Sequence, residues 1–195
     1  MRSTRTHALV GNLGAGLVLA AALMTPQLRA AETATVEQRL QAVEDYVQIE
    51  KLLMRYAAAL NTKDADTYVS LFTPDATFEL KRNVGEPPFL GPFKGHDALR
   101  KQWFPDGGAK GAKTREFGPM RHVTTNYEIN VTGDTATVRA FFMEVVSTGE
   151  NRPSGSQPPK IHQMGRYEDE LVKQNGAWLF SKRTVITDMN TKWEP

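Results

Sequence analysis

Apolar residues recur at helical spacing from Val36 onward, and the stripe that they form shifts once. Its two parts, each at four-three-four spacing, are Val36, Leu40, Val43 and Val47, then Ile49, Leu53, Tyr56 and Leu60. Residues at this spacing lie on one face of an α-helix. The shift at residues 48–50 therefore predicts one long helix whose two halves face different neighbours.

Shorter elements follow this helix. A second helix is predicted from Asp64 or Asp66 to about Phe72, because either aspartate can cap it and Thr73-Pro74-Asp75 supplies a turn. Residues 76–80 are predicted to form a short strand. Residues 83–95 are rich in Pro and Gly and indicate a loop, after which a helix should end near Phe104.

From residue 121 the hydrophobic period changes to two, which is typical of β-strands. One hairpin is predicted from residues 121–131 and 135–148, joined at Gly133-Asp134. A second is predicted from residues 162–173 and 178–188, joined at Asn175-Gly176. Helices followed by long antiparallel strands indicate an α+β domain, with a curved antiparallel sheet wrapped around the N-terminal helices.

The first 30 residues have the pattern of a secretory signal peptide. Arg2 and Arg5 give a positive start, residues 8–24 are apolar, and Ala30 is a small residue at the cleavage point. An uncleaved anchor is the alternative, but the apolar run is shorter than the ~20 residues of a membrane span. We expect cleavage after Ala30, a periplasmic or secreted protein, and one domain at residues 31–195.

Loss of the leader changes the charge balance. The chain has 24 Lys and Arg and 22 Asp and Glu; the leader holds three Arg and no acid, which leaves 21 basic and 22 acidic residues. Without a clustered basic face, nucleic acid is not an expected partner, and no membrane is expected after cleavage. The chain has no Cys, and its His residues lack the paired spacing of zinc sites, so we expect no disulfide, metal or cofactor.

The first hairpin places one candidate for proton chemistry on each arm, His122 and Glu144. An imidazole and a carboxylate that meet in a closed pocket can move protons. A two-residue loop would pair Glu128 with Arg139 and Val123 with Glu144, and would turn His122 away. A bulge within residues 123–126 would turn it back.

Glu144 shares its strand face with apolar residues, so it needs a partner. Besides His122, the sequence offers Arg166 or Arg183 as the partner in a structural ion pair. The sequence leaves these alternatives open.

Several segments resemble the SnoaL-like branch of the nuclear-transport-factor-2-like (NTF2-like) fold. They are residues 53–61, residues 71–76, Gly95-His96, His122 with Asn126, and residues 165–169 before Trp178. The resemblance covers nearly all of residues 36–189 and implies a cone formed by a strongly curved sheet and closed by helices, with an internal pocket. This branch includes dehydratases, cyclases, isomerases and proteins of no known activity, so the fold alone does not give the function.

Within that branch, the pocket pattern is similar to the bile-acid and scytalone dehydratases, which use tyrosine, aspartate and histidine. Tyr56 matches the tyrosine, His122 the histidine, and Glu144 the second carboxylate of the bile-acid enzymes. Asn61 stands where the first aspartate would be, which keeps the shape and removes the charge. Glu144 or Asp64 would have to supply that charge.

These observations predict a domain that binds a small, partly apolar molecule, and as an enzyme a cofactor-free lyase or isomerase of the dehydratase type. The candidate catalytic residues are His122, Glu144 and Tyr56, and the candidate substrate-binding residues are Asn61, Asn126, Trp103 and Arg166. The alternative is a non-catalytic binding or assembly domain, which the missing acid at Asn61 favours. Apolar positions on the outer strand faces predict a homo-oligomer, a dimer or trimer.

Overall fold

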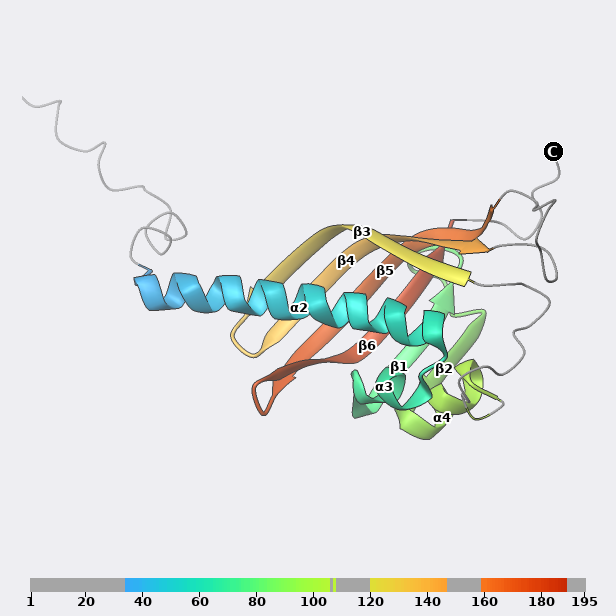
Figure 1. Cartoon of the computed structure of the whole chain (residues 1–195), viewed down its shortest axis with the longest axis horizontal. Coiled ribbons are helices and arrows are strands. Elements are labelled where there is room, and N and C mark those ends of the chain that lie inside the picture. The colour runs from blue at the N-terminus through green and yellow to red at the C-terminus, as the bar shows by residue number, and fades with distance from the viewer. Residues whose placement is uncertain (1–33, 106, 108–119, 147–158, 189–195) are drawn as a thin grey trace, which may run out of the picture. The chain divides into compact units, whose positions relative to one another are not determined.

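A computed structural model describes residues 34–105, 107, 120–146 and 159–188. The helices are α2 (Val36–Thr62), α3 (Ala65–Ser70) and α4 (Gly95–Trp103), and the strands are β1 (Phe72–Lys81), β2 (Leu90–Lys94), β3 (Met120–Thr132), β4 (Thr135–Val146), β5 (Lys160–Gln174) and β6 (Ala177–Thr187) (Figure 1). The predicted leader, residues 1–30, lies outside the described residues. Within them, no helix has the length and apolar character needed to cross a membrane.

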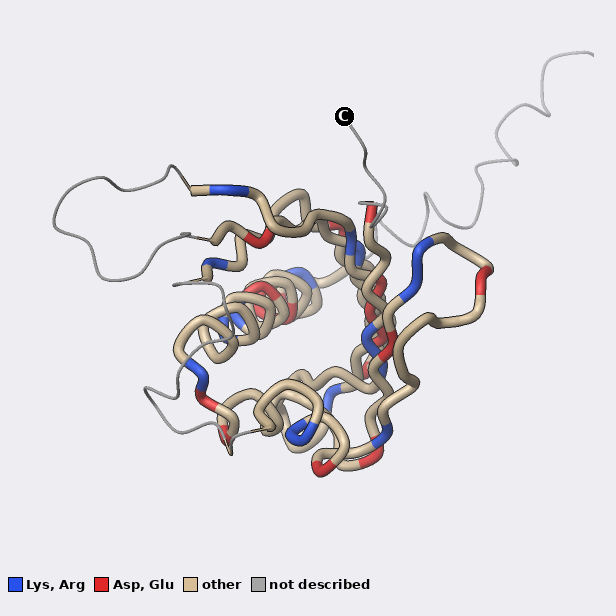
Figure 2. The backbone as a smooth tube through the Cα atoms, turned by 90° about the vertical axis from the view of Figure 1, so that its right-hand side faces the viewer, with Lys and Arg blue, Asp and Glu red and all other residues tan. Residues whose placement is uncertain are grey.

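The six strands form one sheet in the order β2-β1-β6-β5-β4-β3. Figure 2, which looks along α2, shows the strands curving around the helix, with acidic and basic residues interspersed. The α+β prediction is confirmed, but the sheet is mixed, because β1 pairs with β6 in parallel. The whole of β2 to β5 lies between these two strands, which leaves ample chain for the crossover that a parallel pair requires.

Both predicted hairpins form. The β3–β4 turn has Gly133 at φ 58°, and the β5–β6 turn has Asn175 and Gly176 at φ 50° and 79°. Two successive positive φ angles match the right-handed twist of the flanking strands, and Asn-Gly adopts them readily. The turn chemistry in the sequence therefore fixes these two loops.

The prediction of a loop over residues 83–95 is wrong at its end, because Leu90–Lys94 forms β2. This strand lies at the edge of the sheet, where a proline such as Pro92 removes no hydrogen bond from a neighbouring strand. β1 also begins earlier than predicted, at Phe72. α3 begins after Asp64, whose side chain accepts a hydrogen bond from the Thr67 backbone at 3.0 Å.

The two halves of α2 have different surroundings, as predicted. Ile49, Leu53 and Tyr56 of the second stripe are buried in the core, whereas Leu40 and Val43 of the first are 57% and 59% exposed. Core burial therefore begins in the middle of the helix. The functional candidates on α2 all lie in its buried half.

A buried carboxylate ties α2 to the second hairpin. Asp45 Oδ1 accepts hydrogen bonds from Lys173 Nζ at 2.7 Å and from Trp178 Nε1 at 2.9 Å. These contacts join residues more than a hundred positions apart in the chain. They hold the middle of α2 against β5 and β6.

Candidate functional site

A β-bulge in β3 brings His122 opposite Glu144. The register runs from Glu128 opposite Arg139 to Thr125 opposite Phe141, so two residues of β3 face one residue of β4. Asn126 takes up the extra residue with φ 56°, a left-handed conformation that asparagine tolerates better than most residues. The Glu128–Arg139 pairing is as predicted, and the bulge lies where the predicted alternative placed it.

The simple two-residue-loop register is therefore wrong beyond the bulge. Val123 faces Met143, and His122 faces Glu144. Because strand side chains alternate between faces, one inserted residue moves His122 from the outer face of β3 to the face toward α2.

Asn61, near the end of α2, holds His122 from the other side. Its Oδ1 accepts a hydrogen bond from the His122 backbone N–H at 2.9 Å and lies 2.8 Å from His122 Nδ1. The ring is thus fixed by a residue 61 positions earlier in the chain. The structure brings together two of the residues that the sequence pattern aligned with the dehydratases.

The other ring nitrogen faces the carboxylate. His122 Nε2 lies 3.5 Å from Glu144 Oε1, and the two side chains are 8% and 17% exposed. The pair is shielded from water, with its more open side at Glu144. The suggested arginine partners of Glu144 bond elsewhere, since Arg183 pairs with Asp169 and Arg166 with Glu168 and Asp188.

Asp64 was the other candidate to supply charge at this site. Its two carboxylate oxygens accept hydrogen bonds from the backbone N–H and the hydroxyl of Thr67. The carboxylate is therefore engaged in capping α3, and Glu144 is the acid that meets His122.

A second inward-facing ion pair lies on the neighbouring strands. Arg183 donates from Nε and Nη2 to the two oxygens of Asp169 at 2.8 and 2.6 Å, and both side chains are fully buried. The guanidinium also lies 3.9 to 4.2 Å from the ring centres of Tyr56, Tyr167 and Phe180. Burial opposes its charge, but Asp169 outweighs burial and raises the pKa of Arg183.

Tyr56 belongs to this second centre. It packs against Tyr68, Tyr167 and Phe180, and burial raises the pKa of its hydroxyl despite the opposing charge of Arg183. Tyr56 therefore stays protonated at neutral pH. No hydrogen bond or ion pair among the described residues joins it directly to His122 or Glu144.

Sequence reasoning missed Tyr167 as a site residue, although its segment carried the family resemblance. Its ring stacks on Phe142 at 4.5 Å between centres, and burial raises the pKa of its hydroxyl, with Tyr56 and Glu144 adding to the increase. Tyr167 thus lies between the His122–Glu144 pair and the Arg183 centre. The signal for it was the alternation of β5, which places Tyr167 and Asp169 on one face.

The remaining candidates lie apart from His122. Asn126 is exposed at the bulge and accepts a hydrogen bond from the Thr125 hydroxyl at 3.0 Å. Trp103 ends α4 and packs edge-on against Phe78, with a buried indole N–H that has no hydrogen-bond partner among the described residues. Arg166 alternates with the inward-facing Tyr167 and lies on the outer face of the sheet.

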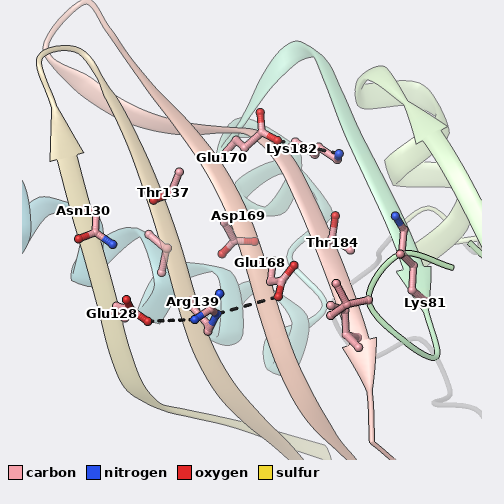
Figure 3. Close-up of a pocket in the computed structure, with 14 residues that line it drawn as sticks. Lys81, Glu128, Asn130, Thr137, Arg139, Glu168, Asp169, Glu170, Lys182 and Thr184 are labelled. Atoms are coloured by element: carbon pink, nitrogen blue, oxygen red, sulfur yellow. Dashed lines mark hydrogen bonds and ion pairs between the residues drawn. The ribbon is translucent and has the colours of Figure 1, made fainter. Parts of the chain in front are cut away.

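A groove of about 440 Å³ opens on that outer face, and Val84 and Gly85 are among the residues that line it. Figure 3 shows the charged and polar residues of its lining. Its charged residues form exposed pairs, such as Arg139 with Glu128 at 3.3 Å and with Glu168 at 3.9 Å. Water screens exposed pairs of this kind and leaves them little chemical effect. We place the candidate site at His122 instead, since its groups are shielded from water and Asn61 holds the ring beside Glu144.

Residues 41–184 match the family model described as the SnoaL-like domain. An uncharacterised protein of Mycobacterium tuberculosis strain H37Rv is 25% identical over 143 residues, which cover 72% of this chain and 84% of that protein. The match to the family model therefore includes most of α2, the bulged strand β3 and nearly all of both hairpins.

Solved structures share the architecture. A protein of unknown function from Mycobacterium tuberculosis has a TM-score of 0.60 and 26% identity, covering 77% of this chain and 76% of that one. A putative scytalone dehydratase from Novosphingobium aromaticivorans has a TM-score of 0.58 and 24% identity, covering 79% and 91%. An NTF2-like protein with a cystatin-like fold from the same species has a TM-score of 0.61 and 18% identity, covering 82% and 94%. The predicted NTF2-like fold is confirmed.

Proposed function

We propose that this chain, which belongs to the SnoaL-like domain family, is an exported protein that binds a small, partly apolar molecule and acts on it as a cofactor-free lyase or isomerase. The observation that carries the proposal is the shielded contact of His122 Nε2 with Glu144 Oε1 at 3.5 Å. Export is supported by the leader pattern of residues 1–30.

In the proposed reaction, His122 Nε2 takes a proton from a carbon next to a carbonyl group. The electron pair left on that carbon forms a C=C bond and expels a hydroxyl group two carbons from the carbonyl. The leaving oxygen takes the proton from His122 and departs as water. Glu144 stabilises the transient imidazolium, and acid–base catalysis of this kind contributes roughly 10²–10⁴-fold to rate.

Hydrogen-bond donors are needed at the carbonyl oxygen, where negative charge develops. The amide nitrogen of Asn61 is one candidate, because its oxygen is already engaged with His122. Tyr56 is the second, since its raised pKa keeps the hydroxyl protonated. A bound substrate would have to reach Tyr56 through the aromatic cluster.

That requirement supports a second candidate function, a non-catalytic binding domain. Tyr56 and the rings around Arg183 are packed together and almost fully buried. A ligand that stays at the more open side of the pair, beside Glu144, would contact His122 without contacting Tyr56. Binding would then take place without the donor that Tyr56 could supply at the carbonyl oxygen.

Proton transfer distinguishes the two candidates. The mature protein is incubated in deuterated water with a panel of cyclic β-hydroxy ketones, and deuterium uptake next to the carbonyl and loss of water are followed by NMR. Lyase or isomerase function predicts uptake that falls in His122→Ala and Glu144→Gln and persists in Arg139→Ala, a control on the outer face. Binding without uptake in the wild-type protein would contradict catalysis and favour the second candidate.

We further propose that two copies associate through the outer face of the sheet. Its support is an apolar surface of Val123, Phe141, Ile161 and Met164, which are 42%, 45%, 51% and 40% exposed and lie on β3, β4 and β5. Apolar surface of this kind is typical of contacts between copies. Sedimentation should show an oligomer that Phe141→Lys dissociates; a wild-type monomer at high concentration would contradict the proposal.

A further inference from the structure

The orientation of the Asn61 amide is set by the backbone of His122. A backbone N–H only donates, so the group 2.9 Å from it must be the amide oxygen and not the amide nitrogen. The same oxygen lies 2.8 Å from His122 Nδ1. It has no hydrogen to offer there, so Nδ1 has to supply one.

The neutral imidazole has one N–H and two acceptors beside it. Asn61 Oδ1 lies 2.8 Å from Nδ1, and Glu144 Oε1 lies 3.5 Å from Nε2. Two lone pairs facing each other at an ordinary hydrogen-bond distance repel strongly, and the repulsion is weaker at the longer separation. The neutral ring therefore carries its hydrogen on Nδ1 and has its lone pair at Nε2, the nitrogen 3.5 Å from Glu144 Oε1.

We propose that Asn61 is a positioning residue that holds neutral His122 as the Nδ1–H tautomer and reserves Nε2 for the exchangeable proton. The choice of Nε2 as the atom that takes a proton from a ligand rests on the proposed function; the tautomer does not. Once Nε2 gains a proton, the ring donates to Asn61 and carries a positive charge beside the Glu144 carboxylate. Proton uptake is thus assisted on both sides of the ring.

An asparagine at position 61 acts on His122 differently from an aspartate. Both offer an oxygen to Nδ1–H, but the amide adds no charge, so the electrostatic pull on an arriving proton comes from Glu144 alone. Without an acceptor at Nδ1, the Glu144 carboxylate would draw the single hydrogen of the neutral ring to Nε2. That tautomer has no lone pair with which to accept a proton at Nε2.

The tautomer is read from ¹⁵N NMR of the imidazole rings in the mature chain, above the pH at which the ring is protonated. The wild-type protein should show His122 protonated on Nδ1, and Asn61→Asp should retain that state. Asn61→Leu, which has similar volume and no acceptor, should shift the hydrogen to Nε2. Amide spectra of the variants report whether each one folds.

His96 provides a control in the same spectrum. Its Nε2 lies 2.9 Å from the Phe72 carbonyl oxygen, which only accepts, so neutral His96 should carry its hydrogen on Nε2. Wild-type His122 with its hydrogen on Nε2 would overturn the proposal, and so would folded Asn61→Leu with the hydrogen still on Nδ1. If the tautomer is as proposed and no deuterium uptake is found, the proposed function fails and the positioning role stands.

Discussion

Two inward-facing ion pairs each join directly opposed residues of one hairpin, and they differ in almost every other respect. His122 lies opposite Glu144 across β3 and β4, and Asp169 lies opposite Arg183 across β5 and β6. The second pair makes two short hydrogen bonds and is fully buried. The first makes a single 3.5 Å contact and is partly open.

The difference separates a structural use of charge from a chemical one. In the Arg183–Asp169 pair both carboxylate oxygens are engaged, and aromatic rings cover the guanidinium, so the charges hold each other and exchange no proton. In His122, Nδ1 lies 2.8 Å from Asn61 Oδ1, whereas Nε2 lies 3.5 Å from Glu144 Oε1. In the proposed function, the less firmly held Nε2 is the nitrogen that takes the proton.

Removing one partner of the buried pair should have the largest effect on folding. Asp169→Asn leaves the Arg183 charge in the core without its counter-charge and should lower the free energy of unfolding by about 3–5 kcal/mol. Urea denaturation measures this loss. The double variant Asp169→Leu with Arg183→Leu should lose less than Asp169→Asn; a larger loss would show that the charges contribute net stability.

The matching change at the other pair should affect chemistry rather than folding. Glu144→Gln keeps the shape and removes the charge that stabilises the imidazolium, so deuterium uptake by a responsive ketone should fall roughly 100-fold. Urea denaturation should show a change in stability within about 1 kcal/mol, because the contact is single and partly exposed. A loss of stability as large as that of Asp169→Asn would remove the distinction between the two pairs.

Asp45 is an intermediate case and gives a pH test. Burial opposes its ionisation, but hydrogen bonds from Lys173, Trp178 and Gln41 outweigh burial and lower the pKa of the carboxyl. A lowered folded pKa means that the stabilisation is complete above the unfolded value of about 3.9 and is lost as pH falls through the folded value.

Lys173→Met tests this assignment. The variant should lose about 1–2 kcal/mol near pH 6, because one charged hydrogen bond to Asp45 is removed. As the pH falls below 4, the variant should lose less additional stability than the wild-type protein. The informative range extends about one pH unit or more below pH 4. Equal acid sensitivity in the two proteins would exclude Lys173 as a cause of the lowered pKa.

The smallest effect is expected at the exposed pair of Arg139 with Glu128. Both side chains are more than half exposed, so Arg139→Ala should change the free energy of unfolding by less than about 0.5 kcal/mol. Urea denaturation of Arg139→Ala in parallel with Asp169→Asn compares the smallest and the largest expected losses of stability. A loss above about 1 kcal/mol exceeds what an exposed ion pair contributes. It would mean that contacts of Arg139 other than this ion pair stabilise the outer face.

The sequence allowed both hairpins to be predicted, because period-two alternation and the Asn175-Gly176 turn are local signals. It also predicted the Glu128–Arg139 pairing, which depends only on loop length. The parallel contact of β1 with β6 was missed, because it joins strands from the two ends of the domain and has no local signature. β2 was missed because its proline resembled a loop signal, although proline is tolerated at a sheet edge.

At the candidate site, residue types were predictable and their partners were not. The meeting of His122 with Glu144 depends on one left-handed residue, Asn126, and asparagine only permits that conformation without requiring it. The contact of Asn61 with His122 spans 61 positions. The pairing of Arg183 with Asp169 rather than with Glu144 depends on the register of β5 and β6 relative to β4, for which the chain carries no local signal.

The residues of β3 before Asn126 can pair with β4 in two registers, one with the bulge and one without it. Deletion of Asn126 would leave Tyr127 opposite Ala140 and Thr125 opposite Phe141, so the ladder would become regular and His122 would still face Glu144. Pairing of the intact strand without the bulge would instead shift residues 120–125 by one position, place Val123 opposite Glu144 and turn His122 outward. The bulge therefore accommodates one surplus residue of β3, and a relative that lacks this residue would keep the His122–Glu144 pair on a regular strand.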